Sequence, residues 1–135
     1  MTTADFVAAF GQAVASRRSR GARTPTGIAQ QWGEFVRAVE AGYDDSIYEF
    51  DNDLSVRGLI AHLLSDPAIL AHAESSWFLD SVESIDEKFR SLLTRVPIRD
   101  LEGPWWRSHL PRMAGAELAV DFHTRYGYEV ERIVC

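Results

Sequence analysis

The stretch from Tyr43 to Arg57, YDDSIYEFDNDLSVR, combines two patterns that decide how the chain is interpreted. Its apolar residues recur at helical spacing, at Ile47, Phe50 and Leu54. Its acidic residues are Asp44, Asp45, Glu49, Asp51 and Asp53. A helix with this pattern buries one apolar stripe and turns a negative face outward. We therefore expect one helix from about residue 43 to Ser65, with Asp45, Glu49 and Asp53 in an acidic stripe beside the apolar one. The alternative is a turn at Asn52 and Asp53 that splits this helix in two.

The same periodicity predicts helices on both sides of this stretch, at about 3–18, 27–41, 66–94 and 114–126. The inward residues expected for the first two are Phe6, Phe10, Val14, Ile28, Trp32, Phe35, Val36 and Val39. Asp66 and Pro67 form a start signal, and Gly42 and Gly127 are expected stops.

The segment 66–94 carries two apolar stripes that do not share one phase. The first stripe contains Leu70, Ala73 and Trp77, and the second contains Phe78, Val82, Ile85, Phe89 and Leu92. The slip between them predicts a break or kink near Ser75. Pro97 and Pro104 then bracket an irregular segment that leads into a loop with Trp105 and Trp106.

Together these segments predict an all-α fold: a compact bundle of about five helices with an irregular Trp-Trp loop. Residues 1–135 are expected to form a single helical domain. Residues 128–135 fit neither period, so a short C-terminal strand and a packed tail are both retained as alternatives.

The charge and the cysteine content limit the kinds of function that fit this sequence. A formal net charge of −6 disfavours general binding to DNA or RNA and suits a basic protein partner. The single cysteine, Cys135, allows no intrachain disulfide. No apolar run approaches the roughly 18 residues of a membrane span, and the apolar segment Phe6–Ala15 lacks the preceding basic residues of a signal peptide. We therefore predict a cytoplasmic protein without membrane contact.

Motifs of known chemistry are missing from the sequence. The histidines, His62, His72, His109 and His123, do not form HExxH or Glu-x-x-His patterns. GxSxG and glycine-rich phosphate motifs do not occur either. We predict no catalytic residue, no metal and no cofactor. The alternative is a small helical enzyme that uses His62 or His123 with a nearby carboxylate.

The acidic stretch has two interpretations. Most charge runs are solvated helix faces, and the five acids fit that description. The functional interpretation is a docking surface for a cationic protein, because aromatic and amide side chains lie among the acids. On this second interpretation the partner-binding residues are Asp44, Asp45, Tyr48, Glu49, Asp51, Asn52 and Asp53, with Trp105 and Trp106 at the rim.

The Trp-Trp loop also has two interpretations. The indoles can plug the end of the bundle, or they can form an exposed patch with Arg107, His109 and Arg112. Because neighbours in an extended loop point in opposite directions, we expect one indole in the core and one at the surface. A further alternative is an adaptor subunit that self-associates through this loop. The sequence sets no oligomeric state.

The run Ile47–Leu54 with Arg57, followed later by Trp105, Trp106, Arg107 and Pro111, resembles a known group of proteins. It is similar to small acidic proteins of high-GC bacteria that serve as immunity partners of secreted toxins. The resemblance covers the middle and late parts of the chain. It implies a non-enzymatic protein that binds and neutralises a bacterial toxin, such as a basic nuclease, through its acidic helix face.

Overall fold

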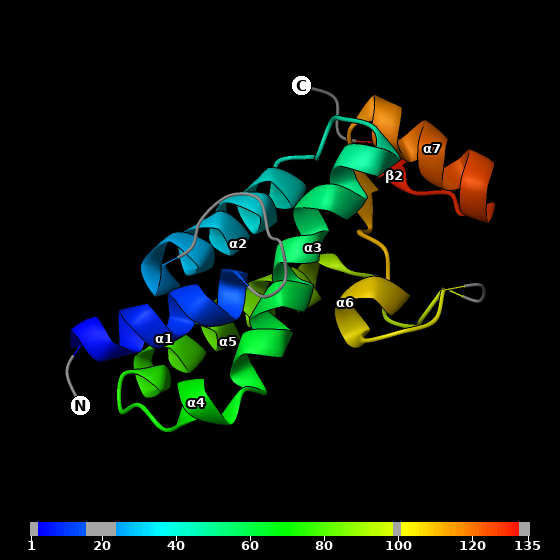
Figure 1. Cartoon of the computed structure of the whole chain (residues 1–135). Helices are drawn as coiled ribbons and strands as arrows, with labels where there is room; N and C mark the ends of the chain where they lie inside the picture. The colour runs from blue at the N-terminus through cyan, green and yellow to red at the C-terminus, as the bar shows by residue number, and fades with distance from the viewer. Residues whose placement is uncertain (1–2, 16–23, 99–100, 133–135) are drawn as a thin grey trace. The chain divides into compact units, whose positions relative to one another are not determined.

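The computed structural model describes residues 3–15, 24–98 and 101–132, and in this part of the chain it contains seven helices and two short strands (Figure 1). The elements are α1 (Thr3–Ala15), α2 (Pro25–Glu40), α3 (Ile47–Leu64), α4 (Pro67–Leu70), α5 (Ser75–Leu92), α6 (Trp105–Ser108), β1 (Met113–Ala114), α7 (Ala116–Tyr126) and β2 (Glu131–Arg132). The fold class is all-α, as predicted. The expected end of the first helix at residue 18 and Cys135 lie outside the described residues. Among the described helices, none combines the length and apolar character that crossing a membrane requires.

The contacts divide the chain into two units, and α2, α3 and α5 contribute residues to both. The first unit is Met1–Glu34 with Leu54–Ile85, and the second is Phe35–Asp53 with Asp86–Cys135. The expectation of a single domain over residues 1–135 stays a prediction.

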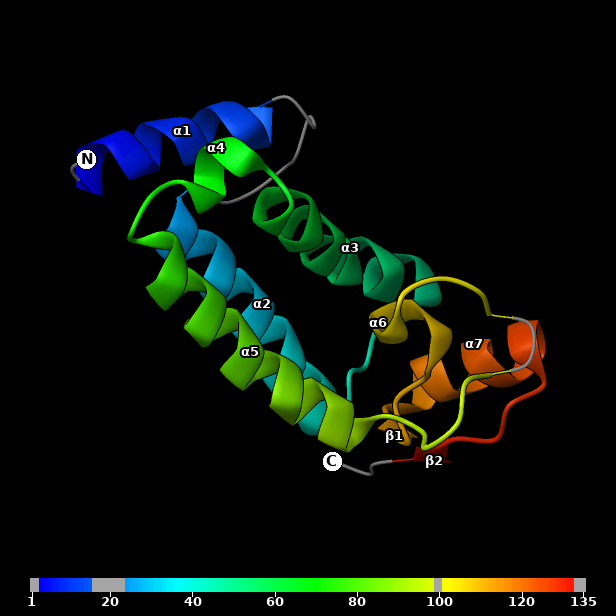
Figure 2. The ribbon, with the colours of Figure 1, turned by 90° about the horizontal axis from the view of Figure 1, so that it is seen from below.

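Aromatic rings form the core of the first unit. Phe6 and Phe10 of α1 are fully buried, with ring centroids 5.9 Å apart, and Phe10 meets Phe78 of α5 edge-on at 5.1 Å. The short α4 lies against α1 (Figure 2). Asp66 caps α4 as predicted, because its carboxylate accepts the Ala68 N–H at 2.9 Å. The inward positions expected for Phe6 and Phe10 are therefore confirmed.

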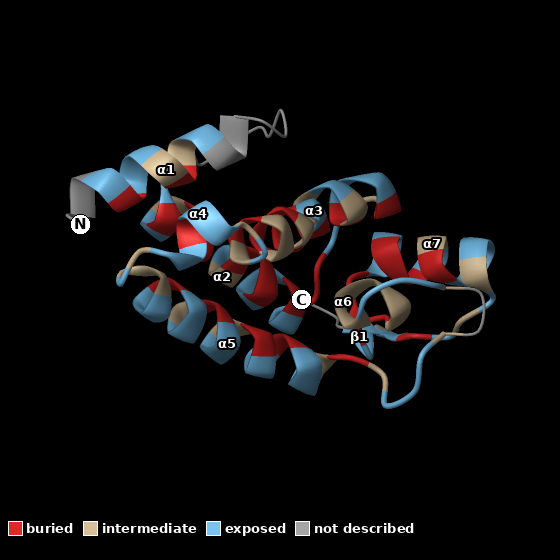
Figure 3. Ribbon diagram, turned by 60° about the horizontal axis from the view of Figure 1, so that its bottom comes forward, coloured by how far each residue is buried: buried red, intermediate tan, exposed pale blue. Residues whose placement is uncertain are grey.

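The break expected near Ser75 is confirmed, and it explains why only one of the two predicted stripes is buried. Phe78, Val82 and Phe89 of α5 are buried, and buried and exposed residues alternate along this helix (Figure 3). Leu70 and Trp77 are instead 50% and 41% exposed, so the prediction that the first stripe is buried was wrong. Because α4 ends at Leu70 and α5 begins at Ser75, the helical period restarts between them.

Phe50 of α3 is the centre of the core of the second unit. Its ring centroid lies 5.4 Å from those of Phe35 and Tyr43 and 5.5 Å from that of Phe122 in α7. All four of these aromatic residues are buried. The acidic stretch is therefore attached to the fold through its apolar residues, as the periodicity predicted.

The start of α3 differs from the prediction. The helix begins at Ile47 and not near residue 43, because Ser46 stands at its N-cap: the Ser46 Oγ accepts the Glu49 N–H at 3.2 Å. The Asp45 carboxylate accepts the Ser46 N–H at 2.7 Å from the loop before the helix. Asp45 therefore cannot belong to a helical stripe with Glu49 and Asp53.

The C-terminal part of the second unit contains the short strand that was one of two alternatives. β2 pairs in parallel with β1, with Met113 opposite Glu131 and Ala114 opposite Arg132. α7 stops at Gly127 as predicted, with a left-handed φ of 66° that favours glycine. The helix count of about five was too low, because the segment 66–94 holds two helices and the Trp-Trp loop holds the single turn α6.

Candidate functional site

Two of the predicted partner-binding acids have structural hydrogen bonds at the start of helices. Asp44 Oδ1 accepts the Glu117 N–H in the first turn of α7, with an N···O distance of 3.3 Å. Asp45 binds the backbone before α3, as described above. Carboxylates at helix starts satisfy N–H groups that have no intrahelical acceptor. Both side chains are exposed, yet each stabilises a helix start.

Asp53 also has a partner inside the second unit. Its Oδ2 accepts the hydroxyl of Tyr43 at 2.6 Å, and Tyr43 is only 8% exposed. Burial raises the pKa of the Tyr43 phenol, and the hydrogen bond to Asp53 and the nearby negative charges raise it further. This hydrogen bond connects Tyr43, in the loop before α3, to Asp53 within α3.

The remaining predicted residues on α3 are more accessible. Tyr48 is 70% exposed, and its ring centroid lies 5.2 Å from the guanidinium of Arg125 in α7. Glu49 and Asn52 are exposed, and Asp51 is half-buried. Partial burial raises the pKa of Asp51, although the positive charges of Arg107 and Arg125 oppose that shift.

Trp105 and Trp106 are both half-buried, so the expectation of one core and one surface indole was wrong. The reason is that they begin α6, where neighbouring residues differ by about 100° and do not point in opposite directions. Their rings meet edge-on with centroids 5.7 Å apart. Trp105 also packs on Phe89 of α5 at 6.1 Å.

A pocket of about 560 Å³ opens beside Trp105, at the C-terminal end of α5. Its frame is an antiparallel pairing of the segments 92–98 and 108–112, which begin at the last residues of α5 and α6. Backbone hydrogen bonds run from Thr94 N to Leu110 O, from Arg112 N to Leu92 O and from Ile98 N to Ser108 O, at 2.8–2.9 Å. The pairing brings side chains from both segments to one opening.

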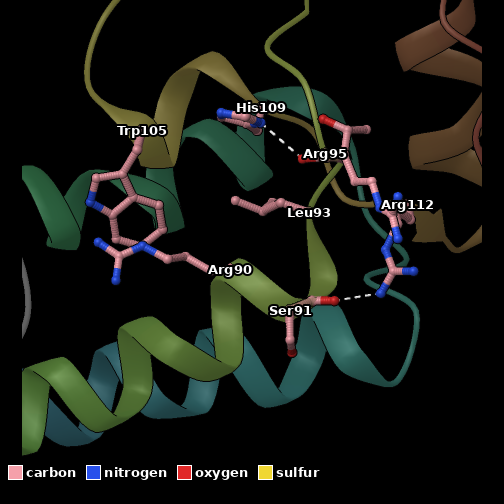
Figure 4. Close-up of a pocket in the computed structure, with 8 residues that line it drawn as sticks. Arg90, Ser91, Leu93, Arg95, Trp105, His109 and Arg112 are labelled. Carbon is pink, nitrogen blue, oxygen red and sulfur yellow. Dashed lines mark hydrogen bonds between the residues drawn. The ribbon is translucent and has the colours of Figure 1, made fainter.

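The pocket is strongly basic (Figure 4). Its lining residues are Arg90, Ser91, Leu93, Thr94, Arg95, Trp105, His109 and Arg112. None of these described residues is acidic, although the whole chain carries a net charge of −6. Arginine guanidinium groups match phosphate and carboxylate oxygens in geometry and charge. The lining is therefore suited to an anion.

Internal contacts orient three of the lining side chains, Arg90, Arg112 and His109. The Arg90 guanidinium lies 4.1 Å from the centroid of the Trp105 ring. Arg112 donates from Nη2 to the carbonyl of Ser91, and a guanidinium has further N–H donors for a ligand. His109 Nδ1 lies 2.9 Å from the carbonyl of Thr94. This contact places the Nδ1 proton on the carbonyl side, so Nε2 is the nitrogen that can meet a ligand.

An acidic residue lies near the pocket but has its own cationic partner. Glu40 lines a smaller cavity of about 30 Å³ together with Arg112, and it forms an ion pair with Lys88 of α5. Because Lys88 balances Glu40, the arginines of the larger pocket keep a net positive field.

The alternative of an enzyme site built from a histidine and a carboxylate has less support from the geometry. His123 Nδ1 lies 2.7 Å from a carboxylate oxygen of Glu129, but both side chains are largely exposed. Such a pair on an open surface lacks the enclosed setting that acid–base catalysis uses. Within the described residues, no group of three or more His, Cys, Asp or Glu side chains is placed to hold a metal ion.

Arg90 and Arg95 are the two pocket arginines that the sequence patterns did not single out, whereas Trp105, His109 and Arg112 were part of the expected aromatic patch. One feature of the sequence could have pointed to the basic pocket. The segments Arg90–Ile98 and Gly103–Ala116 contain no acidic residue, although acids are common in the rest of the chain. No protein-family model, curated protein or solved structure matches this chain.

Proposed function

We propose that this protein is a binding protein whose basic pocket takes an anionic ligand. The observation that carries the proposal is the convergence of Arg90, Arg95 and Arg112 on one concave site without a lining acid. Hydrogen bonds from charged donors to an anion are about twice as strong as those between neutral groups. The volume lies within the range of roughly 300–1,000 Å³ that is typical of small-molecule sites.

Isothermal titration with inorganic phosphate and pyrophosphate at constant ionic strength tests the proposal. Arg95→Gln removes one cation while keeping a polar side chain, and loss of a hydrogen bond to a charged group weakens binding by about tenfold or more. Arg37→Gln is the matched control, because Arg37 is exposed on α2 and does not line the pocket. Equal losses in the two variants, or no saturable binding in the unmodified protein, would refute the pocket as the site.

A second proposal retains a protein partner of the immunity type, a cationic toxin, bound through the exposed side of α3. The observation that favours it is Tyr48, a large aromatic side chain that is 70% exposed beside the exposed Glu49 and Asn52. Exposed tyrosines among polar residues are frequent anchors of protein interfaces. Complementary charge would speed association with a basic partner.

The test of this second proposal is binding to the product of the neighbouring gene. Tyr48→Ala and Glu49→Gln remove candidate contacts without touching the hydrogen bonds of Asp44, Asp45 or Asp53. We expect a loss of affinity of at least tenfold for Tyr48→Ala. Asp80→Asn, on the exposed side of α5, serves as a charge control. Unchanged affinity for Tyr48→Ala and Glu49→Gln argues against a partner on α3.

A further inference from the structure

The basic pocket has two chemically different sides (Figure 4). On one side the guanidinium of Arg90 lies over the indole of Trp105, 4.1 Å from the ring centroid. On the other side Arg95 and Arg112 lie together. The buried Leu93 lies between the two sides and provides an apolar floor. A ligand that uses the whole pocket therefore needs a flat part and a charged part.

The size of the pocket supports a ligand larger than a simple anion. At about 560 Å³ the pocket is comparable to sites that enclose whole small molecules. A free phosphate could contact Arg95 and Arg112 but would leave the surface of Trp105, Arg90 and Leu93 exposed to water. Planar rings stack favourably on aromatic side chains and on guanidinium planes. Filling that surface with a ring therefore adds affinity beyond the charge contacts.

From these two sides we infer that the pocket binds a small nucleotide-like ligand: a planar ring joined through a short spacer to a phosphate. The ring stacks on the layer formed by Trp105 and Arg90. The phosphate accepts hydrogen bonds from Arg95 and Arg112. Nε2 of His109 is available for a further contact with the ligand. This inference deepens the proposed anion-binding function and rests on it.

Three probes separate the contributions: adenosine 5′-monophosphate carries ring and phosphate, inorganic phosphate carries the anion alone, and adenosine carries the ring alone. Isothermal titration at constant ionic strength measures each affinity. We expect the monophosphate to bind about tenfold or more tightly than phosphate, and adenosine to bind more weakly than the monophosphate. In nitrogen-15 spectra of the tryptophan side chains, the monophosphate should shift the indole N–H signal of Trp105, identified by Trp105→Leu.

Substitutions distinguish the two sides of the pocket. Trp105→Leu should reduce the affinity for the monophosphate to about the affinity that the same variant has for phosphate. Arg95→Gln should weaken both ligands, and Arg37→Gln neither. Because Trp105 also packs on Phe89, circular dichroism must show that the leucine variant is folded, and Arg90→Gln provides a second test of the stacking side.

Each negative result would refute a different part of the two proposals. If phosphate binds and the monophosphate binds no better, the nucleotide-like ligand is refuted and the anion pocket stands. If neither binds, both proposals fall. If adenosine binds as well as the monophosphate, the site is a ring site without an anion subsite, which also refutes the inference. Tighter binding of a 5′-phosphorylated oligonucleotide than of the monophosphate would refute a small ligand in favour of a nucleic-acid end.

Discussion

Asp44 and Asp121 take part in a reciprocal pair of hydrogen bonds. Asp121 of α7 binds the start of α3, and Asp44, just before α3, binds the start of α7. Asp121, within α7, accepts the N–H of Ile47 at the first position of α3, at 2.9 Å. Asp44, in the loop before α3, accepts the N–H of Glu117 in the first turn of α7, at 3.3 Å. The two carboxylates therefore hold the starts of α3 and α7 together across more than 70 residues of sequence. This reciprocal contact is the reason why part of the acidic stretch is structural.

Removal of the carboxylate at position 121 should destabilise the protein. Asp121→Ala leaves the half-buried N–H of Ile47 without this acceptor, and loss of a cap costs about 1–2 kcal/mol in the free energy of unfolding. Urea unfolding monitored by circular dichroism measures the change. Asp121→Asn keeps an acceptor oxygen and should retain most of the stability. Equal losses for alanine and asparagine would mean that the charge, and not the hydrogen bond, is what matters.

Gly115 should not tolerate a side chain. A Cβ at this position would lie 2.5 Å from the Cβ of Asp44, and the Gly115 N–H already binds the carbonyl of Tyr43 at 3.0 Å. Gly115→Ala should therefore lower the free energy of unfolding by about 1–3 kcal/mol through overpacking. The control is Gly58→Ala on α3, where the added Cβ would have no described atom within 4 Å apart from its chain neighbours and the helix's own nearby backbone. Because alanine is the better helix former, that variant should gain about 0.5–1 kcal/mol. A gain for both variants would contradict the close approach at Gly115.

Tyr43→Phe should destabilise the protein at neutral pH and change its response to alkali. The hydroxyl lost from this position donates to Asp53 at 2.6 Å, and a hydrogen bond to a charged group contributes about 1.5 kcal/mol or more.

The pH dependence follows from the raised pKa of Tyr43. Below a pH of about 10 the phenol is protonated in both the folded and the unfolded protein, so its stabilising contribution is complete. Above that pH only the unfolded state releases the proton, and the stability of the unmodified protein falls. The difference in unfolding free energy between Tyr43 and Tyr43→Phe should therefore narrow from pH 9 to pH 11. A constant difference over that range would contradict the bonded, buried phenol.

Asp51→Asn should stabilise the protein at neutral pH. Burial raises the pKa of Asp51 in spite of the attraction of Arg107 and Arg125, so the ionised form is disfavoured in the folded state. A neutral amide avoids that cost. Since a raised pKa means that stability is lost as pH rises through it, the advantage of the asparagine should shrink as pH falls from 7 towards 4. The exposed Glu49→Gln is the control and should change stability by less than about 0.5 kcal/mol. A loss of stability in Asp51→Asn would instead mean that the electrostatic attraction of Asp51 to the arginines outweighs the cost of its burial.

Periodicity alone predicted most of the fold. The inward positions Ile28, Trp32 and Phe35 of α2 and Phe50 of α3 are buried as expected. This works because a helix buries one face, so the spacing of apolar residues carries the information. The spacing failed at Leu70 and Trp77, where a short non-helical segment interrupts the period.

The candidate site residues were harder to predict from sequence, because their surroundings depend on contacts between distant segments. Asp44 and Asp53 look equivalent to Asp51 in a charge run, yet the first two bind Glu117 and Tyr43. Arg90 and Arg95 resemble any solvated helix end until the segments 92–98 and 108–112 pair and bring Trp105 and Arg112 beside them. The sequence by itself determined the helices, the apolar stripes and the excess of acid. Only the tertiary structure decided which acids act within the fold and where the arginines converge, because hydrogen bonds and pockets form between residues that no local spacing relates.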